Sequence, residues 1–318
     1  FMNAIYRIGF MTIQNLRSFC RRFFYSPLRS LFRSLNSAVL AVKAPSSTVT
    51  VRATPAARVA NQPCKPITIL SANLWHDWPR YRQLKPRLNA FANLVATETV
   101  DIILLQEVAR TSKFKVDEWL ADRLGMGYTY LRANGHEPEI GFEEGLAVFS
   151  RFPLYGADWQ QLGTSAFQLS RRMALGAEVK TPCGNLKVFS VHLGLSSTAN
   201  RFQLDRLRDW VGKTANQQTS IIGGDFNTHE DRAHIQGLQK AWVDIFRHKN
   251  PGRDGTTHEL RWPWGRILRQ HRLDYLFMQN GVERWDVLEA DHIHAQVGKG
   301  VHSDHRAVLA RVVPVSQA

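Results

Sequence analysis

Short apolar runs alternate with amphipathic stretches along the chain from residue 67 onward. Residues 67–74 and 101–107 form two such runs, and their β-branched and aliphatic side chains predict strands. The second run is apolar at every position from 102 to 105, which predicts a strand buried on both faces. Between the two runs, apolar residues recur at helical spacing, so we expect a helix that begins near Pro86.

The alternation continues toward the C-terminal end of the chain. It predicts further helices over 116–124, 198–211 and 231–240, and a largely irregular segment over 244–270. It predicts further strands at 128–131, 146–150, 173–179, 186–193, 221–225, 273–278 and 301–313. Because short strands alternate with a few helices, we expect an α/β fold in which two sheets pack face to face with helices outside.

The first 64 residues differ from the rest in composition. Residues 1–66 hold ten of the 41 Lys and Arg and none of the 27 Asp and Glu, so the remainder carries a formal net charge of only +4. The overall charge of +14 is therefore weak support for nucleic-acid binding by the body of the chain. We expect residues 1–64 to be a separate head and linker, and residues 65–318 to be the folded domain.

Several interpretations of this head stay open. Its basic, acid-free composition is typical of a targeting sequence or of a disordered segment outside the mature protein. Residues 5–35 also fit a basic amphipathic helix that lies on a membrane surface. Four prolines within residues 44–66 favour a linker after it.

The chain has three cysteines, which are Cys20, Cys64 and Cys183. Their spacing matches neither a disulfide framework nor a zinc site. The domain should therefore not need an oxidising compartment, and an intracellular location is favoured. No apolar run reaches the roughly 18 residues of a membrane span.

The stretch 221–228 combines a strand pattern with candidate chemistry. Ile221 and Ile222 lead in, two glycines follow, and Asp225 and Asn227 stand where the strand should end. Two residues apart on an extended chain, these polar side chains point the same way. An anionic acceptor and a neutral donor facing one spot suit a phosphate group. The structural alternative is a strand that ends in an Asx turn.

Polar residues recur where the other predicted strands begin or end. The full set is Asn73, Glu107, His192, Asp225, Asn227, Asp274, Asp304 and His305. Each residue alone has a structural explanation as a turn, a cap or a hydrogen-bonded core side chain. Together they supply oxygen ligands for a hard cation such as Mg²⁺, and histidines and amides for a phosphate.

Seven segments resemble, in order, those of the endonuclease/exonuclease/phosphatase superfamily of metal-dependent hydrolases. They are SANLW at 71–75, LQE at 105–107, EGLAVFSR at 144–151, SVHL at 190–193, GDFN at 224–227, LDYL at 273–276 and SDH at 303–305. The resemblance implies a four-layer α/β sandwich, with two central, mostly antiparallel sheets flanked by helices. It also implies a phosphoesterase that uses Mg²⁺, with Mn²⁺ able to substitute.

The resemblance further implies roles for individual residues. Glu107 would be the main Mg²⁺ ligand, with Asp304 and Asn73 close to the metal. His305, oriented by Asp274, would hold the scissile phosphate or act as the general base.

The remaining roles concern the other side of the phosphate. His192, paired with Glu144, would contribute acid or phosphate-binding work. Asp225 would orient the attacking water or assist the leaving group, and Asn227 would donate to a phosphate oxygen.

The substrate stays open at this point. Trp75 and the continuation Arg306-Ala307-Val308 depart from the abasic-site endonuclease pattern and disfavour that branch. A nuclease is slightly favoured, because Trp262, Trp264 and Arg266, with Arg261, Arg269 and Arg272, are suited to bind phosphates and bases.

Other functions compete with the nuclease. A sphingomyelinase-like enzyme would use the same tryptophans on a membrane surface. A small-molecule phosphatase and a catalytically silent binding domain are further alternatives. We expect a phosphate-ester substrate, with DNA or RNA among the candidates, and a monomer.

Overall fold

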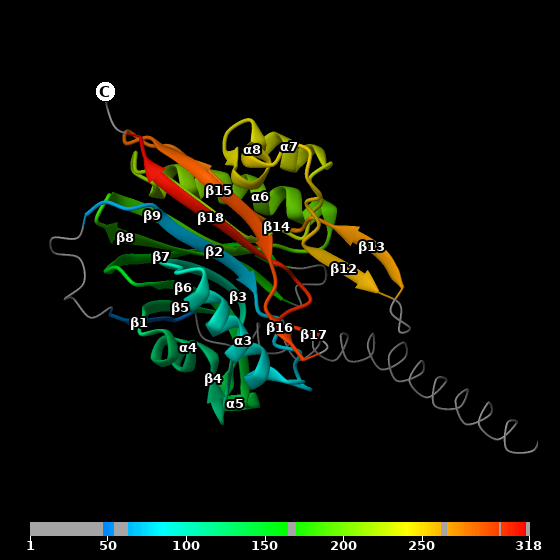
Figure 1. Cartoon of the computed structure of the whole chain (residues 1–318). Coiled ribbons are helices and arrows are strands. Elements are labelled where there is room, and N and C mark those ends of the chain that lie inside the picture. The colour runs from blue at the N-terminus through cyan, green and yellow to red at the C-terminus, as the bar shows by residue number, and fades with distance from the viewer. Residues whose placement is uncertain (1–46, 54–62, 165–169, 262–265, 299, 316–318) are drawn as a thin grey trace, which may run out of the picture.

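The computed structural model describes residues 47–53, 63–164, 170–261, 266–298 and 300–315. The predicted head helix over residues 5–35 lies outside these residues, as do Trp262 and Trp264. Strands fill the middle of the molecule, and helices lie on two opposite outer sides (Figure 1).

The first sheet has eight strands in the order β1-β5-β6-β3-β2-β18-β15, with β4 paired to β3. Their bounds are β1 Val49–Arg52, β2 Ile67–Asn73, β3 Ile102–Thr111, β4 Phe114–Lys115, β5 Gly127–Gly135, β6 Phe142–Ser150, β15 Trp285–Ile293 and β18 Ala307–Pro314. Only the central pair, β2 and β3, is parallel. The expected antiparallel character is therefore confirmed for this sheet.

The second sheet has six strands in the order β11-β14-β10-β9-β8-β7. They are β7 Leu154–Thr164, β8 Arg171–Thr181, β9 Gly184–His192, β10 Ser220–Asp225, β11 Val243–Asp244 and β14 Asp274–Gln279. Here too one central pair, β9 and β10, is parallel. Two short hairpins complete the strands, β12 His258–Arg261 with β13 Ile267–His271, and β16 Gln296–Val297 with β17 Gly300–Val301.

Six helices lie among the described residues. They are α3 Leu84–Thr97, α4 Val116–Leu124, α5 Glu137–Ile140, α6 Ser197–Thr214, α7 Ala233–Gln239 and α8 Ile245–Lys249. Helices α3 and α4 cover the first sheet, and α6 and α7 lie on the far side of the second sheet (Figure 1). Helix α8 packs at the edge between the two sheets, where its Ile245 and Phe246 join the central core.

Three hydrophobic cores separate the four layers. Along β3, Ile102 and Leu104 face the core between the sheets, whereas Ile103 and Leu105 face the core beneath α3 and α4. A third core packs the outer face of the second sheet against α6 and α7. The predictions of a strand buried on both faces and of a four-layer sandwich are confirmed.

The two glycines of the 221–228 stretch allow close packing within this sandwich. They lie inside β10. A Cβ on Gly224 would lie 2.0 Å from the Val191 carbonyl oxygen of β9. A Cβ on Gly223 would meet Leu104 of the opposite sheet at 2.7 Å.

Some elements were missed by the hydrophobic pattern. The segment 244–270, predicted to be irregular, contains α8 and the β12–β13 hairpin, and the pattern also missed β7 and β15. These elements are short or lie at sheet edges, where tertiary pairing overrides the local signal.

The folded part of the chain begins before residue 65. Val49–Arg52, within the predicted linker, pair with β5 as the edge strand of the first sheet, and Val49 packs on the central core. Although no disulfide was expected from the cysteine spacing, Cys64 and Cys183 form one, with their Cα atoms 4.7 Å apart. This bond ties the start of the domain to the β8–β9 turn.

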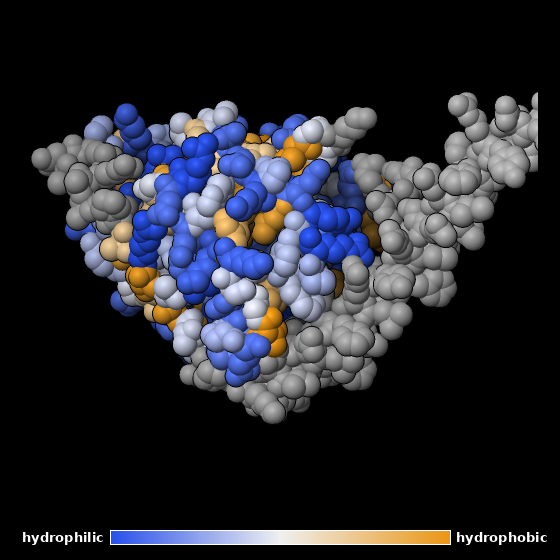
Figure 2. All heavy atoms as spheres, turned by 90° about the horizontal axis from the view of Figure 1, so that it is seen from below, coloured by the Kyte–Doolittle hydropathy of each residue, from blue (hydrophilic) through white to orange (hydrophobic). Residues whose placement is uncertain are grey.

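Figure 2 shows one outer face of the molecule. Seen from the side that carries α4 and α5, the surface is mostly hydrophilic, and hydrophobic residues form small separate patches (Figure 2). Among the described residues, no helix combines the length and apolarity that crossing a bilayer requires.

We predict that deleting residues 1–64 lowers the melting temperature, because the deletion removes both β1 and Cys64. Loss of a disulfide that closes a long loop typically costs about 2 to 4 kcal/mol. Deleting only residues 1–46, which retains both features, is the control. Equal melting temperatures for the two truncated chains, measured by differential scanning calorimetry without reductant, would contradict the assignment of β1 and the disulfide to the fold.

Candidate active site

The candidate site lies where the two central parallel pairs of strands end. Asn73 closes β2, and His192 and Asp225 stand opposite each other at the ends of β9 and β10. The carboxyl ends of parallel strands meet at one edge of a sheet, so each sheet delivers polar side chains to the same edge. A pocket of about 240 Å³ opens there.

The structure brings most of the predicted residues together. The pocket is lined by Glu107, Glu144, His192, Asp225, Asn227 and His305. Asn73 and Asp274 lie behind this lining as buried partners of its members, and Asp304 is exposed beside His305. Arg266 is exposed before β13 and is not part of the pocket lining.

Glu107 reaches the pocket through a β-bulge. It was expected to end its strand, but β3 continues to Thr111, and the pairing with β6 shifts register between Leu105 and Val108. Glu107 has a φ of 54°, which is uncommon for a residue other than glycine. Bulges of this kind re-aim a side chain, and here the carboxylate turns into the pocket.

Asn73 joins the two sheets at this edge. Its Nδ2 donates to Glu107 Oε1 at 3.3 Å and to Asp225 Oδ2 at 3.2 Å. Its Oδ1 accepts the backbone N–H of Trp75 at 2.9 Å. The buried amide is therefore held by its own loop while it connects one carboxylate from each sheet.

His305 and Asp274 form a buried pair. His305 Nδ1 and Asp274 Oδ2 are 2.8 Å apart, as the predicted orientation of His305 by Asp274 requires. Although burial lowers the pKa of His305, the charges of Asp274, Asp225 and Asp304 outweigh it and raise that pKa well above the usual value. The imidazole is thus held in one orientation and in its charged form.

Asp225 is the carboxylate most affected by its surroundings. Its Oδ1 accepts the Asn227 N–H at 2.9 Å, and its Oδ2 lies 3.6 Å from His192 Nε2. Burial, reinforced by the charge of Asp274 and opposed by that of His305, raises its pKa to about 7. Burial and the charge of Arg172 lower the pKa of His192 to about 4, so this imidazole is neutral at pH 7.

Glu144 does not have the partner that was predicted. Its hydrogen-bond partners are His76, whose Nε2 lies 2.5 Å from Oε2, and Asn134, whose Nδ2 donates to Oε1 at 3.1 Å. His192 instead faces Asp225. Burial alone would raise the pKa of Glu144, but His76, which donates a hydrogen bond to it, and the nearby charge of Arg172 lower it to about 2.

His76 was missed in the sequence, although it follows Asn73 by three residues. Its Nε2 is also 3.5 Å from Glu107 Oε2, so the three side chains resemble a metal-binding group. However, Nδ1 accepts the backbone N–H of Trp78 at 2.9 Å, which places the proton on Nε2. His76 is therefore a donor to the two carboxylates and not a metal ligand.

Arg172 is a second residue that the sequence did not reveal. It lines the pocket, and the negative charges of Glu144, Asp225 and Glu107 act on it. Its Nε is buried and has no hydrogen-bond partner among the described residues. Its position in β8 next to Arg171 gave no motif, and only the register of the second sheet brings it to the site.

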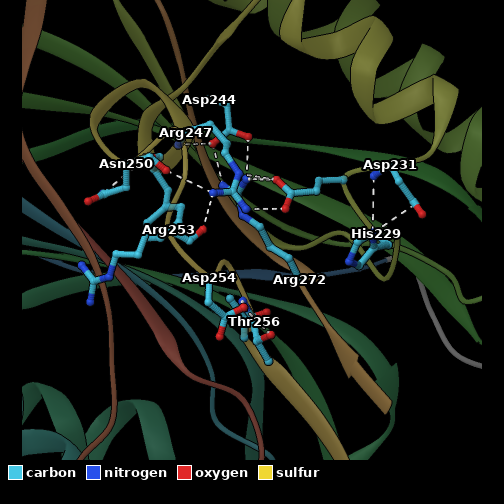
Figure 3. Close-up of polar contacts among 12 residues, drawn as sticks. His229, Asp231, Asp244, Arg247, Asn250, Arg253, Asp254, Thr256 and Arg272 are labelled. Atoms are coloured by element: carbon cyan, nitrogen blue, oxygen red, sulfur yellow. Dashed lines mark hydrogen bonds and ion pairs between the residues drawn. The ribbon is translucent and has the colours of Figure 1, made fainter.

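The basic run had indicated that Arg272 helps to bind phosphates, but the structure does not place it at the pocket. It is 1% exposed and pairs with both oxygens of Asp244 at 2.8 and 2.6 Å and with Glu230 at 2.9 Å. Figure 3 shows Arg272 and Arg247 converging beside Asp244. This ion network is structural, because it fixes the chain two residues before Asp274.

His302 lies in the core and is not part of the pocket lining. It is 2% exposed, stacks on Phe91 and accepts the Ala295 N–H through Nδ1 at 3.0 Å. Burial lowers its pKa to about 3.

Comparisons with known proteins agree with this geometry. The family model described as "Endonuclease/Exonuclease/phosphatase family" matches residues 70–305. The uncharacterized protein YbhP of Escherichia coli K12 is 28% identical over 199 residues, which cover 58% of this chain and 74% of YbhP.

Two solved structures illustrate the likeness in fold. An endonuclease/exonuclease/phosphatase family protein from Leptotrichia buccalis has a TM-score of 0.61 at 20% identity and covers 77% of this chain and 99% of its own. TDP2 of D. rerio, complexed with a single strand DNA product, has a TM-score of 0.61 at 16% identity and covers 78% and 99%. At these identities the likeness concerns the fold.

We predict that stability falls as the pH drops from about 6.5 toward 4, in part through His302. In this window the unfolded chain binds a proton that folded His302 does not, which costs up to about 1.4 kcal/mol per pH unit. His302→Asn keeps an acceptor for Ala295 and should make the decline shallower in urea unfolding at pH 7, 6 and 5. His248→Asn, at a side chain that is 50% exposed, is the control. An unchanged slope in His302→Asn would contradict this account.

We predict that His76→Ala weakens divalent-cation binding about 10- to 100-fold, whereas His76→Gln largely retains it. Loss of a partner behind a metal ligand typically has an effect of this size. Glutamine can still donate a hydrogen bond from a position near the lost Nε2. Calorimetric titration with Mg²⁺ measures the difference, and equal losses in both variants would favour direct ligation by His76.

Proposed function

Because the chain belongs to the endonuclease/exonuclease/phosphatase family, whose members are metal-dependent phosphoric ester hydrolases, we propose that it hydrolyses a phosphodiester with Mg²⁺. The observation that carries the proposal is the convergence of Glu107, the Asp274–His305 pair and Arg172 on one pocket. Carboxylates, an oriented imidazolium and a buried guanidinium are the groups that in-line attack on a phosphate needs.

The proposed metal ligands are Glu107 and Asp304, with Asn73 close by. The donor set fits a hard cation, because carboxylate oxygens face the pocket and Mg²⁺ keeps several waters in place of a full protein cage. Mn²⁺ would be accepted by the same oxygens. A bound cation would offset negative charge on the phosphoryl group. The Nδ2 contacts of Asn73 support a role in placing Glu107.

The other side chains of the site would contact the phosphate from two sides. His305 is proposed to hold a phosphate oxygen or exchange a proton with water, and Asp274 keeps its ring fixed. Asp225, with a pKa of about 7, is suited to orient or deprotonate the attacking water near neutral pH. His192 and Asn227 would contact the phosphate from the strand ends β9 and β10.

A nucleic-acid strand is the substrate that we favour. Arg172 offers an unpartnered donor to a phosphate oxygen. Trp78 and Phe142 line the pocket and stack with ring centroids 5.2 Å apart, which forms an apolar wall for a base. The D. rerio TDP2 structure holds a single strand DNA product in the same fold.

The pocket favours a strand end over a duplex. Its volume of about 240 Å³ is suited to a phosphate and its flanking group.

A lipid phosphodiesterase is the second candidate, favoured by the β12–β13 hairpin. Leu260, Ile267 and Leu268 on this hairpin are 46%, 38% and 47% exposed, next to the exposed Arg266 and Arg269. Apolar side chains beside cations are typical of contact with an anionic membrane surface. No comparable feature of the described residues favours a small-molecule phosphatase or a catalytically silent binding domain.

We predict Mg²⁺-dependent cleavage of single-stranded DNA that is abolished by EDTA. Glu107→Ala and His305→Ala should each lower the rate about 10²- to 10⁴-fold while the protein stays folded. Glu118→Ala and His248→Ala, at side chains that are both 50% exposed, are the controls. A near-normal rate in Glu107→Ala or His305→Ala, with folding checked by circular dichroism, would contradict the site assignment.

The same assay separates the substrates. Sphingomyelin vesicles and a small phosphate monoester are tested in parallel with the DNA. Release of phosphocholine without DNA cleavage would replace the nuclease by the lipid candidate, and turnover of the monoester alone would replace the diesterase.

A further inference from the structure

A second group of metal-binding side chains lies where the β12–β13 hairpin meets the candidate site. His258, Asp304 and His305 each offer one ligand atom, and these atoms lie within 4.8 Å of one another. We propose that they form a binding site for a first-row transition metal such as Zn²⁺, which shares Asp304 with the Mg²⁺ centre proposed at Glu107. His258 is not among the residues given a role in hydrolysis.

The backbone holds the two histidines side by side. His258 and His305 form an antiparallel bridge, and the N–H of Arg306 donates to the Thr257 carbonyl at 2.7 Å. The imidazole centroids are 4.7 Å apart. The neighbouring strands therefore fix the pair of rings before any ligand arrives.

The hydrogen bonds around the rings leave metal-binding nitrogens available. His305 directs Nδ1 to Asp274 Oδ2, so a metal would bind at Nε2 and displace the proton that the charged ring carries there. This carboxylate–histidine arrangement is the usual support behind a metal-bound imidazole. Neither ring nitrogen of His258 has a hydrogen-bond partner among the described residues, and Asp304 is exposed beside it.

The donor set selects the class of metal. Two imidazoles and one carboxylate suit Zn²⁺, Co²⁺ or Ni²⁺, whereas Mg²⁺ and Ca²⁺ prefer oxygen ligands throughout. Bonds of about 2.0 to 2.1 Å around a tetrahedral Zn²⁺ place its ligand atoms about 3.3 Å apart. Rotation of the half-buried His258 and the exposed Asp304 would bring the three atoms to that spacing.

Occupancy of this site has a consequence for the proposed hydrolysis. The metal would take Nε2 of His305 and the carboxylate of Asp304, both of which the proposed reaction uses. Zn²⁺ should therefore inhibit turnover supported by Mg²⁺. The expected inhibition by Zn²⁺ rests on the proposed function, whereas metal binding at this site does not.

The binding test uses the full chain, freed of metal with a chelator and titrated with Co²⁺ while its visible absorption is recorded. Wild type should bind one Co²⁺ tightly, and His258→Ala and Asp304→Asn should bind it at least 10-fold more weakly. His271→Ala is the matched control, because His271 faces His258 across the hairpin. Like His258→Ala, it removes one of the 12 histidines, so the two variants differ only in which histidine is lost. Equal Co²⁺ affinity in wild type and His258→Ala would overturn the proposal.

A second readout separates this proposal from the proposed function. In the DNA assay with excess Mg²⁺, Zn²⁺ should inhibit wild type and His271→Ala but not His258→Ala. If His258→Ala loses Co²⁺ binding while wild type cleaves no substrate, the metal site stands and the proposed function fails. Equal inhibition of all three proteins would overturn the inhibitory role of the site.

Discussion

The site depends on one buried amide that connects the two sheets. Asn73 donates to Glu107 from the first sheet and to Asp225 from the second, and both contacts lie at the seam where the central parallel strands end. Without this donor, two carboxylates would face each other in a poorly solvated space, where like charges repel strongly. The amide thus makes it possible for both sheets to bring acidic groups to one edge.

Further buried contacts hold this seam from both sides. On one side, Arg87 donates to the carbonyls of Leu74, Trp75 and His302, so that one guanidinium ties the Asn73 loop to the segment before Asp304. On the other side, Arg272 is held by Asp244 and Glu230 just before Asp274. In each case a buried cation fixes the backbone next to a functional carboxylate, so the geometry of the site is set by the fold and not by flexible loops.

The sequence predicted the residues at strand ends and missed those that register brings in. Asn73, His192 and Asp225 stand where apolar runs stop, and the carboxyl ends of parallel strands converge, so a local pattern was sufficient. Arg172 and Asn134 lie within or beside strands, and only bulges and pairing bring them near Glu144. Arg272 lies in a basic run, yet its partners Asp244 and Glu230 are 28 and 42 residues away. Ion pairs between residues so far apart in the chain cannot be recognised from the local sequence.

The charges of the pocket explain why a bound cation would favour substrate binding. Glu107, Glu144 and Asp225 line the pocket together with Arg172 and His305, which are its main positive groups. Asp274 and Asp304 act on His305 from beside the pocket. Burial, together with the charge of Asp274, raises the pKa of Asp225. The negative groups of the pocket would repel a phosphate dianion or diester. Protonation of Asp225 removes one charge, and a divalent cation at Glu107 would offset two more. The carboxylates that would repel a phosphate are therefore the groups that would bind the metal that offsets their charge.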